Sequence, residues 1–432
     1  MSPIQYMVEG GHRLAGTIEP AGNKNAALPI IAAALLTEHP VTLENVPRIR
    51  DTETLVELIR SVGASAEWRR NTLAIHARTI RAADLDPVLC ARIRASILLA
   101  GPLLARCGEV TLPPPGGDVI GRRRLDTHFL AFEQMGATVS ATDRLHFRAP
   151  RLRGADVFLD EPSVTATENV LMAAVAAHGL THLRNVASEP HVQDLAHFLV
   201  ALGARIEGIG TNTMIVHGPA TLGPASYSIG PDHIEVGSLI GLAAVTRSSL
   251  RIARAGVEHL RSIRMGFERL GVVCEVEGDD LIVPSAQTLK IRDDFGGHVP
   301  KLEDQPWPAF PADLMSIAIV TATQCDGVIL MFEKMFESRM FFVDKLISMG
   351  ARIVLCDPHR AIVAGPSRLR GALMTSPDIR AGMAMLLAAV CAKGVSTINN
   401  ADQIERGYER IDERLNALGA RITRVPERSR EA

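Results

Sequence analysis

Charged side chains stand directly before two apolar segments of this sequence. Lys24, in GNKNAAL, precedes the apolar segment 26–36, and Asp313, in WPAFPADLM, precedes the apolar segment 314–322. A helix N-terminus attracts anions, and a preceding glycine lets its backbone approach one. A solvated lysine and an aspartate that only caps its helix are the alternatives. Both positions are therefore candidates for chemistry on an anionic substrate.

Arginines occupy similar positions elsewhere in the chain. They lie in RIRASILL, FESRMFF, SPDIRAGM and IERGYERI, as Arg94, Arg339, Arg380 and Arg406. The planar guanidinium group matches the oxygens of phosphate and carboxylate groups. Each arginine alone is more typical of a structural ion pair. Together with Lys24, the group predicts a site for a small anionic ligand.

The segment PPPGGDVIGRRRLDTH, residues 113–128, differs from the rest of the chain. The three prolines and two glycines at its start (PPPGG) predict a loop that is stiff at its base and mobile at its tip, with Asp118 and then three arginines after them. Loops of this length inside a compact domain are usually functional. A surface loop with solvated charges is the alternative.

A repeated unit of about seventy residues positions these groups. Six phrases of the LGA type contain glycines that lie 73, 67, 68, 79 and 69 residues apart. Each unit begins with a segment that is apolar on nearly all sides, which predicts a helix buried within the protein. These segments are residues 26–36, 95–105, 170–177, 238–245, 314–322 and 381–392.

Each unit continues through a β-branched strand and an amphipathic helix, such as 52–62 or 195–202, which ends at the repeated glycine. One or two further strands complete it. A division near Gly230 and Pro231 gives three units on each side. The pattern predicts two halves, each with three sheets around three buried helices, and the cleft between the halves is the default ligand site.

The composition agrees with a two-domain protein that binds a small ligand. At 432 residues, two domains are the natural expectation. The formal net charge of −2 argues against a nucleic-acid-binding or polybasic membrane protein. Six cysteines without a CxxC pair indicate neither a disulfide framework nor a zinc site. No signal peptide is recognised and no apolar run reaches the ~18 residues that span a bilayer, so a cytoplasmic location is expected.

Nine motifs of the chain resemble those of the enolpyruvyl transferases. In order, between Gly10 and Ile422, they are GNKNAALPI, RASILLAGPLLAR, PGGDVIGRRRLDTH, PSVTATENVLMAA, PDHIEVGS, FPADLM, FESR, PDIRAG and ERGYERI. The resemblance implies an α/β fold, a two-domain inside-out barrel of six βαβαββ-like units with buried helices, three per domain. It implies one domain at residues 23–230, with the mobile loop 113–121, and a second at residues 1–22 and 231–432.

The resemblance also implies an activity. The family transfers the enolpyruvyl group of phosphoenolpyruvate to a hydroxyl group and releases phosphate, by addition and then elimination, with no metal or organic cofactor. The loop and RRRLDTH match the branch whose acceptor is the 3-hydroxyl of UDP-N-acetylglucosamine. That reaction is the first committed step of peptidoglycan synthesis and serves cell-wall biogenesis, cell shape and division. Shikimate 3-phosphate is disfavoured as acceptor. Enolpyruvyl transfer to a different nucleotide or sugar acceptor in a secondary pathway, and a non-catalytic sugar-nucleotide-binding paralogue, remain alternatives.

Site residues follow from the resemblance, position by position. Cations around the phosphate of phosphoenolpyruvate correspond to Lys24, Arg94 and Arg123. Cations that hold its carboxylate, or add charge nearby, correspond to Arg339, Arg380 and Arg406. The general base that accepts the sugar hydroxyl proton corresponds to Asp313, and a contact to the sugar corresponds to Asn25. The uridine diphosphate contacts correspond to Arg123, Arg124, Leu125, Asp126, Thr127, Ser163, Val164 and Thr165, with Asp126 at the uracil edge.

Three positions depart from the family pattern. Asp118 stands where the family usually has a reactive cysteine. A carboxylic acid can deliver a proton to the developing methyl carbon if its pKa is raised. It cannot act as the thiolate that opens the epoxide of fosfomycin, so the resemblance implies an active, fosfomycin-insensitive enzyme. Arg50 replaces a lysine with retention of charge, and His233 replaces an arginine that contacts the nucleotide.

Overall fold

The structure is a computed structural model of the chain, and it describes residues 4–81, 85–118 and 120–426. These residues form two compact units. The internal unit holds the described residues of 22–118 and 123–230, and the terminal unit holds those of 1–21, 119–122 and 231–432. The predicted loop 113–121 is thereby divided between the units, because Ile120 and Gly121 belong to the terminal unit. Val119 of this loop lies outside the described residues.

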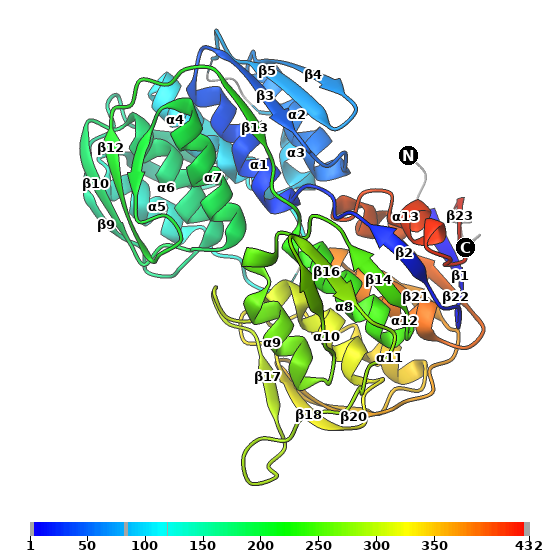
Figure 1. The fold of residues 1–432 in the computed structure, drawn as a ribbon. Coiled ribbons are helices and arrows are strands. Elements are labelled where there is room, and N and C mark those ends of the chain that lie inside the picture. The colour runs from blue at the N-terminus through cyan, green and yellow to red at the C-terminus, as the bar shows by residue number, and fades with distance from the viewer. Residues whose placement is uncertain (1–3, 82–84, 119, 427–432) are drawn as a thin grey trace. The chain divides into compact units, whose positions relative to one another are not determined.

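Three buried helical segments form the centre of the internal unit (Figure 1). They are α1 (Lys24–Ala33) with η1 (Ala34–Leu36), η2 (Arg94–Leu99) with α4 (Ala100–Cys107), and α6 (Val164–Ala176). The sequence predicted a single helix at 95–105, but this segment begins as a 3₁₀-helix. Pro102 has no N–H to donate to Leu98, so an α-helix cannot run through this point without losing a hydrogen bond.

Three sheets and four outer helices surround these segments in the internal unit. The first sheet has the order β13 (Ala225–Ser228), β3 (Pro40–Glu44), β5 (Thr72–His76), β4 (Ser65–Arg69). The second has the order β11 (Arg205–Glu207), β12 (Thr213–Gly218), β10 (Gly179–Arg184), β9 (Asp156–Phe158). The third has the order β6 (Glu109–Leu112), β8 (Leu145–Arg148), β7 (Thr138–Ala141). The helices are α2 (Arg50–Ser61), α3 (Pro87–Arg92), α5 (Asp126–Gln134) and α7 (Pro190–Leu202).

The terminal unit repeats this plan. Its buried helices are α8 (His233–Val245), α10 (Met315–Ala322), which follows η4 (Ala312–Leu314), and α12 (Ile379–Cys391). Two of its sheets have the orders β15 (Glu275–Glu277), β16 (Asp280–Val283), β14 (Ser249–Ile252), β2 (Ala15–Ile18) and β17 (Lys301–Glu303), β18 (Gly327–Phe332), β20 (Arg360–Gly365), β19 (Ile353–Asp357). Its other helices are η3 (Val257–His259), α9 (Arg261–Arg269), α11 (Val343–Ser348), η5 (Ala401–Arg406) and α13 (Ile411–Ala417).

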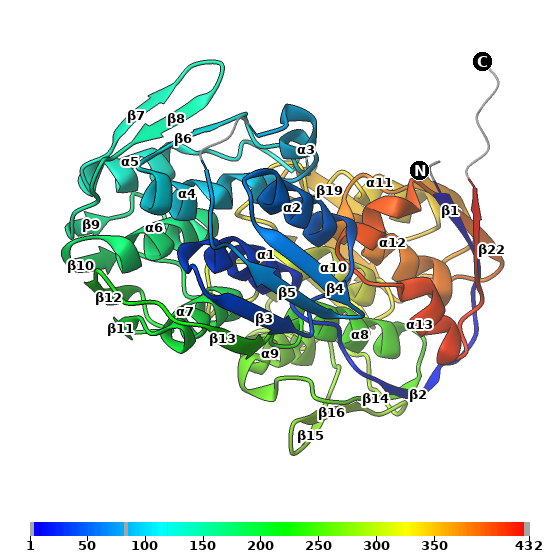
Figure 2. The same cartoon turned by 90° about the horizontal axis from the view of Figure 1, so that it is seen from above.

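The third sheet of the terminal unit joins the two ends of the chain (Figure 2). Its order is β21 (Leu373–Thr375), β22 (Val395–Asn399), β1 (Ile4–Glu9), β23 (Ile422–Pro426). Strand β1 is antiparallel to both neighbours, with Tyr6 opposite Ile398 on one side and Arg424 on the other. The first strand of the sequence therefore completes a sheet built from the last segments of the chain.

The repeated glycines end helices as predicted. Gly63, Gly136, Gly203, Gly271, Gly350 and Gly419 all have positive φ. Gly203 caps α7 with φ 116° and ψ 6°, and a Cβ atom there would lie 2.8 Å from the carbonyl oxygen of Thr221. Only glycine adopts this conformation at low cost.

The described elements confirm the α/β fold class, with three sheets around three buried helices in each unit. The buried helices carry Lys24, Arg94 and Arg380 in their first turns, and Asp313 lies in the turn that leads into α10. Among the described residues, none of the helices combines the length and the apolar character that crossing a bilayer requires.

Candidate active site

One carboxylate and two arginines form an ion-paired cluster in the terminal unit, here called the Asp313 trio (Asp313, Arg339 and Arg380). Arg339 Nη2 donates to Asp313 Oδ1 at 2.6 Å, and Arg380 donates to Asp313 Oδ2 through Nε at 2.9 Å and Nη2 at 2.8 Å. Asp313 does not cap α10, because its carboxylate is occupied by the arginines. Three segments far apart in sequence are thus joined by one carboxylate.

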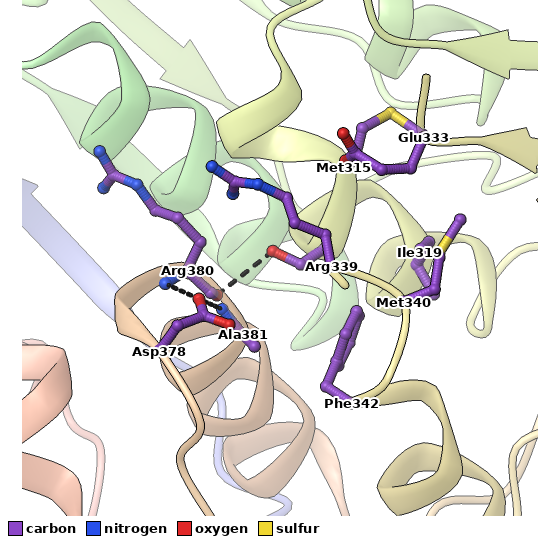
Figure 3. A pocket seen from close by; sticks show the side chains of 10 residues that line it. Met315, Ile319, Glu333, Arg339, Met340, Phe342, Asp378, Arg380 and Ala381 are labelled. Carbon is purple, nitrogen blue, oxygen red and sulfur yellow. Dashed lines mark hydrogen bonds between the residues drawn. The ribbon is translucent and has the colours of Figure 1, made fainter. Parts of the chain in front are cut away.

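The start of α12 holds Arg380 in place. Asp378 caps this helix and accepts from the backbone N–H groups of Arg380 and Ala381, at 2.8 and 2.9 Å. Figure 3 shows these bonds, with the guanidinium groups of Arg380 and Arg339 extending side by side. The side chain of Arg380 is 7% exposed and that of Arg339 is 11% exposed, whereas Asp313 is 24% exposed. The carboxylate is therefore the most accessible member of the trio.

The ion pairs dominate the electrostatics of the trio. Burial opposes ionisation of Asp313, but the charges and hydrogen bonds of Arg380 and Arg339 outweigh it, so its pKa lies far below the usual value. Burial also opposes the charge on each arginine, and Asp313 outweighs it, so both arginine pKa values are raised. The trio carries two positive charges and one negative charge, which leaves a surplus that suits an anion.

His233 and Arg406 lie in the same unit as the trio. His233 begins α8 and packs edge-on against Trp307 with 5.8 Å between ring centroids. Burial and the nearby charges of His259 and Arg380 lower the pKa of His233 to about 3. Its imidazole is therefore neutral near pH 7 and does not replace the charge of the expected arginine. Arg406 lies in η5 and donates to Gln403 Oε1 at 2.8 Å.

Lys24 forms a buried ion pair in the internal unit. Its Nζ lies 3.0 Å from Asp51 Oδ2, with the two side chains 11% and 6% exposed. Lys24 is the first residue of α1, and Asn23 caps this helix by accepting from the backbone N–H groups of Asn25 and Ala26. A solvated lysine at a helix start is therefore excluded. Asn25 is partly buried at the next position.

Arg94 connects the second buried segment to the basic stretch after the loop. Its Nη2 donates to the backbone carbonyl oxygens of Arg123 at 2.7 Å and Arg124 at 3.2 Å. Burial and the charge of Arg123 lower the pKa of Arg94 to about 10. A Cβ atom on Gly117, which has φ +102°, would lie 2.9 Å from Arg94 Cβ, so the loop packs on Arg94. Asp118 follows in this loop and is partly buried.

The two predicted nucleotide-binding segments, 123–127 and 163–165, lie together. Arg124 bonds to both Asp126 and Asp160 at 3.2 Å, and Thr127 Oγ1 donates to Asp160 Oδ1 at 2.7 Å. Thr165 Oγ1, in the first turn of α6, lies 3.0 Å from Nε2 of His128, in the first turn of α5. Around these contacts, Leu125 and Ser163 are the N-caps of α5 and α6, and Val164 begins α6.

Several supporting residues were missed from the sequence. Asp51, which pairs with Lys24, directly precedes the predicted amphipathic helix 52–62 and had no predicted role. His128 Nδ1 lies 3.1 Å from Asn169 Nδ2, and Asn169 Oδ1 accepts from Gly101 N at 2.9 Å. Burial and the charge of Arg94 lower the pKa of His128 to about 3. Glu333, six residues before Arg339, is fully buried. Asn169 could have been recognised in the sequence, because it is a polar residue directly before the predicted apolar segment 170–177.

Comparisons with known proteins agree along nearly the whole chain. A family model described as EPSP synthase (3-phosphoshikimate 1-carboxyvinyltransferase) matches residues 8–415. The chain is 88% identical over 429 residues to a UDP-N-acetylglucosamine 1-carboxyvinyltransferase of Bradyrhizobium diazoefficiens, covering 99% of this chain and 100% of the relative. It is 57% identical to the Treponema pallidum enzyme of the same name, with 96% of this chain and 98% of the relative covered.

Solved structures share the fold. The enolpyruvyl transferase NikO from Streptomyces tendae matches with a TM-score of 0.87 at 26% identity, covering 99% of this chain and 100% of that chain. EPSP synthase from Acinetobacter baumannii matches with a TM-score of 0.75 at 17% identity, covering 98% and 100%. By its sequence and its fold, the chain belongs to the EPSP synthase family of carboxyvinyltransferases, the enolpyruvyl transferases.

Proposed function

We propose that this protein transfers the enolpyruvyl group of phosphoenolpyruvate to the 3-hydroxyl of UDP-N-acetylglucosamine and releases phosphate. The observation that carries the proposal is the 88% identity, along 429 residues, to a UDP-N-acetylglucosamine 1-carboxyvinyltransferase. The Asp313 trio supports it, because it joins a candidate base to two cations. The reaction is the first committed step of peptidoglycan synthesis, in the cytoplasm. The two domains are residues 23–230 and residues 1–22 with 231–432.

Asp313 is the proposed general base. It accepts the proton of the 3-hydroxyl while that oxygen bonds to C2 of phosphoenolpyruvate, and C3 receives a proton from Asp118. In the second step the Asp118 carboxylate takes a proton back from C3, the C2–C3 double bond re-forms, and the C2–O bond to phosphate breaks. Phosphate leaves with the electron pair of that bond, so no oxidant or reductant is needed.

The ion pairs of Asp313 decide when it can act as a base. With both arginines bound, its pKa is far below the usual value, and a carboxylate of this kind accepts protons poorly. In the proposed mechanism the substrate carboxylate takes over Arg339 and Arg380 as its own partners. Asp313 then loses the two charges that depress its pKa, and its basicity rises. Binding of phosphoenolpyruvate thus prepares the base.

The cations of the internal unit have the complementary role. Lys24, Arg94 and Arg123 are proposed to bind the phosphate group, and Arg406 of the terminal unit adds positive charge. The charge on the leaving phosphate is stabilised by cations that are already oriented, which is the most effective form of electrostatic catalysis.

The acceptor contacts are proposed on the segments that lie together in the internal unit. Asn25 contacts the sugar. The uridine diphosphate is held by residues 123–127 and 163–165, and Asp126, which is exposed, reads the uracil edge. The contacts of Arg124 and Thr127 with Asp160 orient this segment.

Release of inorganic phosphate from phosphoenolpyruvate tests the proposal. We expect release that depends on UDP-N-acetylglucosamine, together with a product of the combined mass. The likeness to NikO, an enolpyruvyl transferase of another name, favours a second candidate, enolpyruvyl transfer to a different acceptor, which can be another nucleotide or a sugar. Nucleotides without the acetylglucosamine group therefore serve as comparison acceptors. No release with UDP-N-acetylglucosamine, but release with another nucleotide, would replace the first proposal by the second. Release with neither would support the binding paralogue.

A further inference from the structure

Glu333 is a fully buried carboxyl group beside the Asp313 trio. It directly follows β18, and its backbone is fixed on both sides: its N–H donates to His359 O at 2.8 Å, and its carbonyl oxygen lies 2.7 Å from His359 Nδ1. Neither carboxyl oxygen of Glu333 accepts a hydrogen bond from a donor among the described residues. An ionised carboxylate in such a place would be very costly.

The neighbouring carboxyl group shows which of the two holds the proton. Asp304, also fully buried, accepts from the backbone N–H groups of Lys334 and Met335. Both oxygens of Asp304 therefore accept hydrogen bonds, whereas those of Glu333 accept none from the described residues. The nearby Asp304 disfavours a negative charge on Glu333. Among the described residues no donor offsets a charge on Glu333, so its carboxyl group is the one that keeps a proton.

A cavity connects Glu333 to the arginines. It is lined by Glu333, Arg339, Asp378 and Arg380 together with the apolar side chains of Met315 and Phe342, among others (Figure 3). Its room is that of about one water molecule. The Nε of Arg339 is buried and has no acceptor among the described residues. An ionised Glu333 therefore has both the space and the partner to compete with Asp313 for Arg339.

The charged and titratable groups that surround Glu333 come from every element packed on it. They are Asp304 after β17, Asp313 in η4, Lys334 and Arg339 after β18, His359 before β20, and Asp378 and Arg380 at the start of α12. Burial, and then the charge of Asp304, raise the pKa of Glu333 to about 9, against the opposing effect of Arg339.

We propose that Glu333 is a positioning residue that acts through its neutral, protonated carboxyl group. In that form it leaves Arg339 to Asp313 and to the substrate carboxylate, and it preserves the surplus positive charge of the trio. Ionisation of Glu333 removes the surplus positive charge of the trio and attracts Arg339 away from Asp313. The inference rests on the proposed function in one respect, because the arginines are taken to bind phosphoenolpyruvate.

The variant Glu333→Gln tests the inference, since glutamine has nearly the same size and shape as glutamate and is neutral at every pH. We expect the KM for phosphoenolpyruvate and kcat near pH 7 to stay within about threefold of the wild-type values. As the pH rises through about 9, the wild-type KM should increase more than that of E333Q, with kcat less affected. Glu277→Gln, the same change at a half-exposed carboxylate of the same unit, should follow the wild type throughout.

Thermal unfolding gives a readout that does not depend on activity. In the unfolded chain Glu333 loses its proton near the ordinary pKa of 4.5, whereas in the folded protein it keeps the proton up to the raised pKa of about 9. Between these two pH values only the folded protein holds this proton. The wild type must therefore lose stability relative to E333Q as the pH rises through this window. We expect the difference between the Tm of E333Q and that of the wild type to increase, in favour of E333Q, as the pH rises through this window.

Each opposite outcome overturns the inference. A loss of tenfold or more in E333Q near pH 7, or a failure of E333Q to fold, would mean that the ionised carboxylate is needed. A Tm difference that does not change with pH would mean that Glu333 holds no extra proton. A wild-type protein without phosphate release would contradict the proposed function instead, and the Tm comparison would still decide on Glu333.

Discussion

The two units hold their candidate catalytic cations in different ways. In the terminal unit, one carboxylate serves two arginines, so the Asp313 trio keeps a surplus positive charge. In the internal unit, the buried ammonium group of Lys24 is paired with the carboxylate of Asp51. Arg94 donates there to backbone carbonyl oxygens, which carry partial charges only.

This difference separates two uses of a buried acid. Asp313 is shared and partly accessible, so a substrate carboxylate can replace it as the partner of the arginines. Asp51 is 6% exposed and has the role of compensating a lysine that is itself buried. Removal of a carboxylate should therefore damage chemistry in the terminal unit and stability in the internal unit. Four substitutions test that comparison.

Asp313→Ala should have the largest effect. It removes the proposed base, whose assistance typically contributes about 10²–10⁴-fold to turnover. The binding of UDP-N-acetylglucosamine should stay within about tenfold of the wild type, because the nucleotide contacts are proposed on other residues. Phosphate release and calorimetric binding measure the two quantities. A variant with more than half of the wild-type rate would remove Asp313 from the mechanism.

Asp51→Asn should act on stability. It leaves the ammonium group of Lys24 buried without its compensating charge, and breaking a buried pair in this way costs about 3–5 kcal/mol. Urea unfolding measures the loss. Asp156→Asn is the matched control in the same unit, since Asp156 pairs with Arg184 at the surface, with the two side chains 61% and 45% exposed. Equal losses in the two variants would show that burial of the Lys24 pair does not matter.

Asp118→Cys should leave turnover within about tenfold while creating a new sensitivity. A thiolate opens the fosfomycin epoxide, whereas a carboxylate is a poor nucleophile toward it. The wild type should therefore remain active in the presence of fosfomycin. The variant should lose activity and carry one covalent adduct on the loop 113–121. Mass spectrometry decides. An inactivating adduct on the wild-type protein would contradict the assignment of Asp118 to the position of the reactive cysteine.

Arg124→Gln should have the smallest effect. Arg124 is 41% exposed, and its ion pairs with Asp126 and Asp160 lie at the surface, where such pairs contribute little to stability. We expect an unchanged Tm and a KM for UDP-N-acetylglucosamine raised by no more than about tenfold. A KM for phosphoenolpyruvate that rises by more than the KM for the nucleotide would place Arg124 with the phosphate cations instead.

The fold was largely predictable because the helices of each repeat unit can be recognised from local sequence patterns. An all-apolar segment predicts a buried helix, and a glycine after an amphipathic helix predicts its end, wherever the segments lie in space. The predicted segment 381–392 corresponds to α12 (Ile379–Cys391). The predicted segment 170–177 covers the second half of α6, which ends at Ala176. The 3₁₀ start at Arg94 was not foreseen, although Pro102 was visible in the sequence.

The supporting side chains of the site were not predictable in the same way. Asn169 holds the backbone of Gly101, 68 residues earlier, and Arg380 reaches Asp313 across 67 residues. No periodic pattern specifies such partners, because they depend on how separate repeats pack. The family resemblance supplied Asp313 and the arginines, but not Glu333 or Asp51, whose importance comes from burial beside a charge.

The place of β1 has a consequence for the order in which the chain matures on the ribosome. This strand is made first, yet both strands that flank it, β22 and β23, are among the last to be made. At ordinary translation speeds, about ten to forty seconds pass between synthesis of residue 230 and that of β23. The internal unit can fold during that interval, while a strand containing Tyr6 and Val8 waits with its apolar face uncovered. For this protein, β1 (Ile4–Glu9) therefore stays exposed to chaperones and to mispairing until the second half of synthesis is complete.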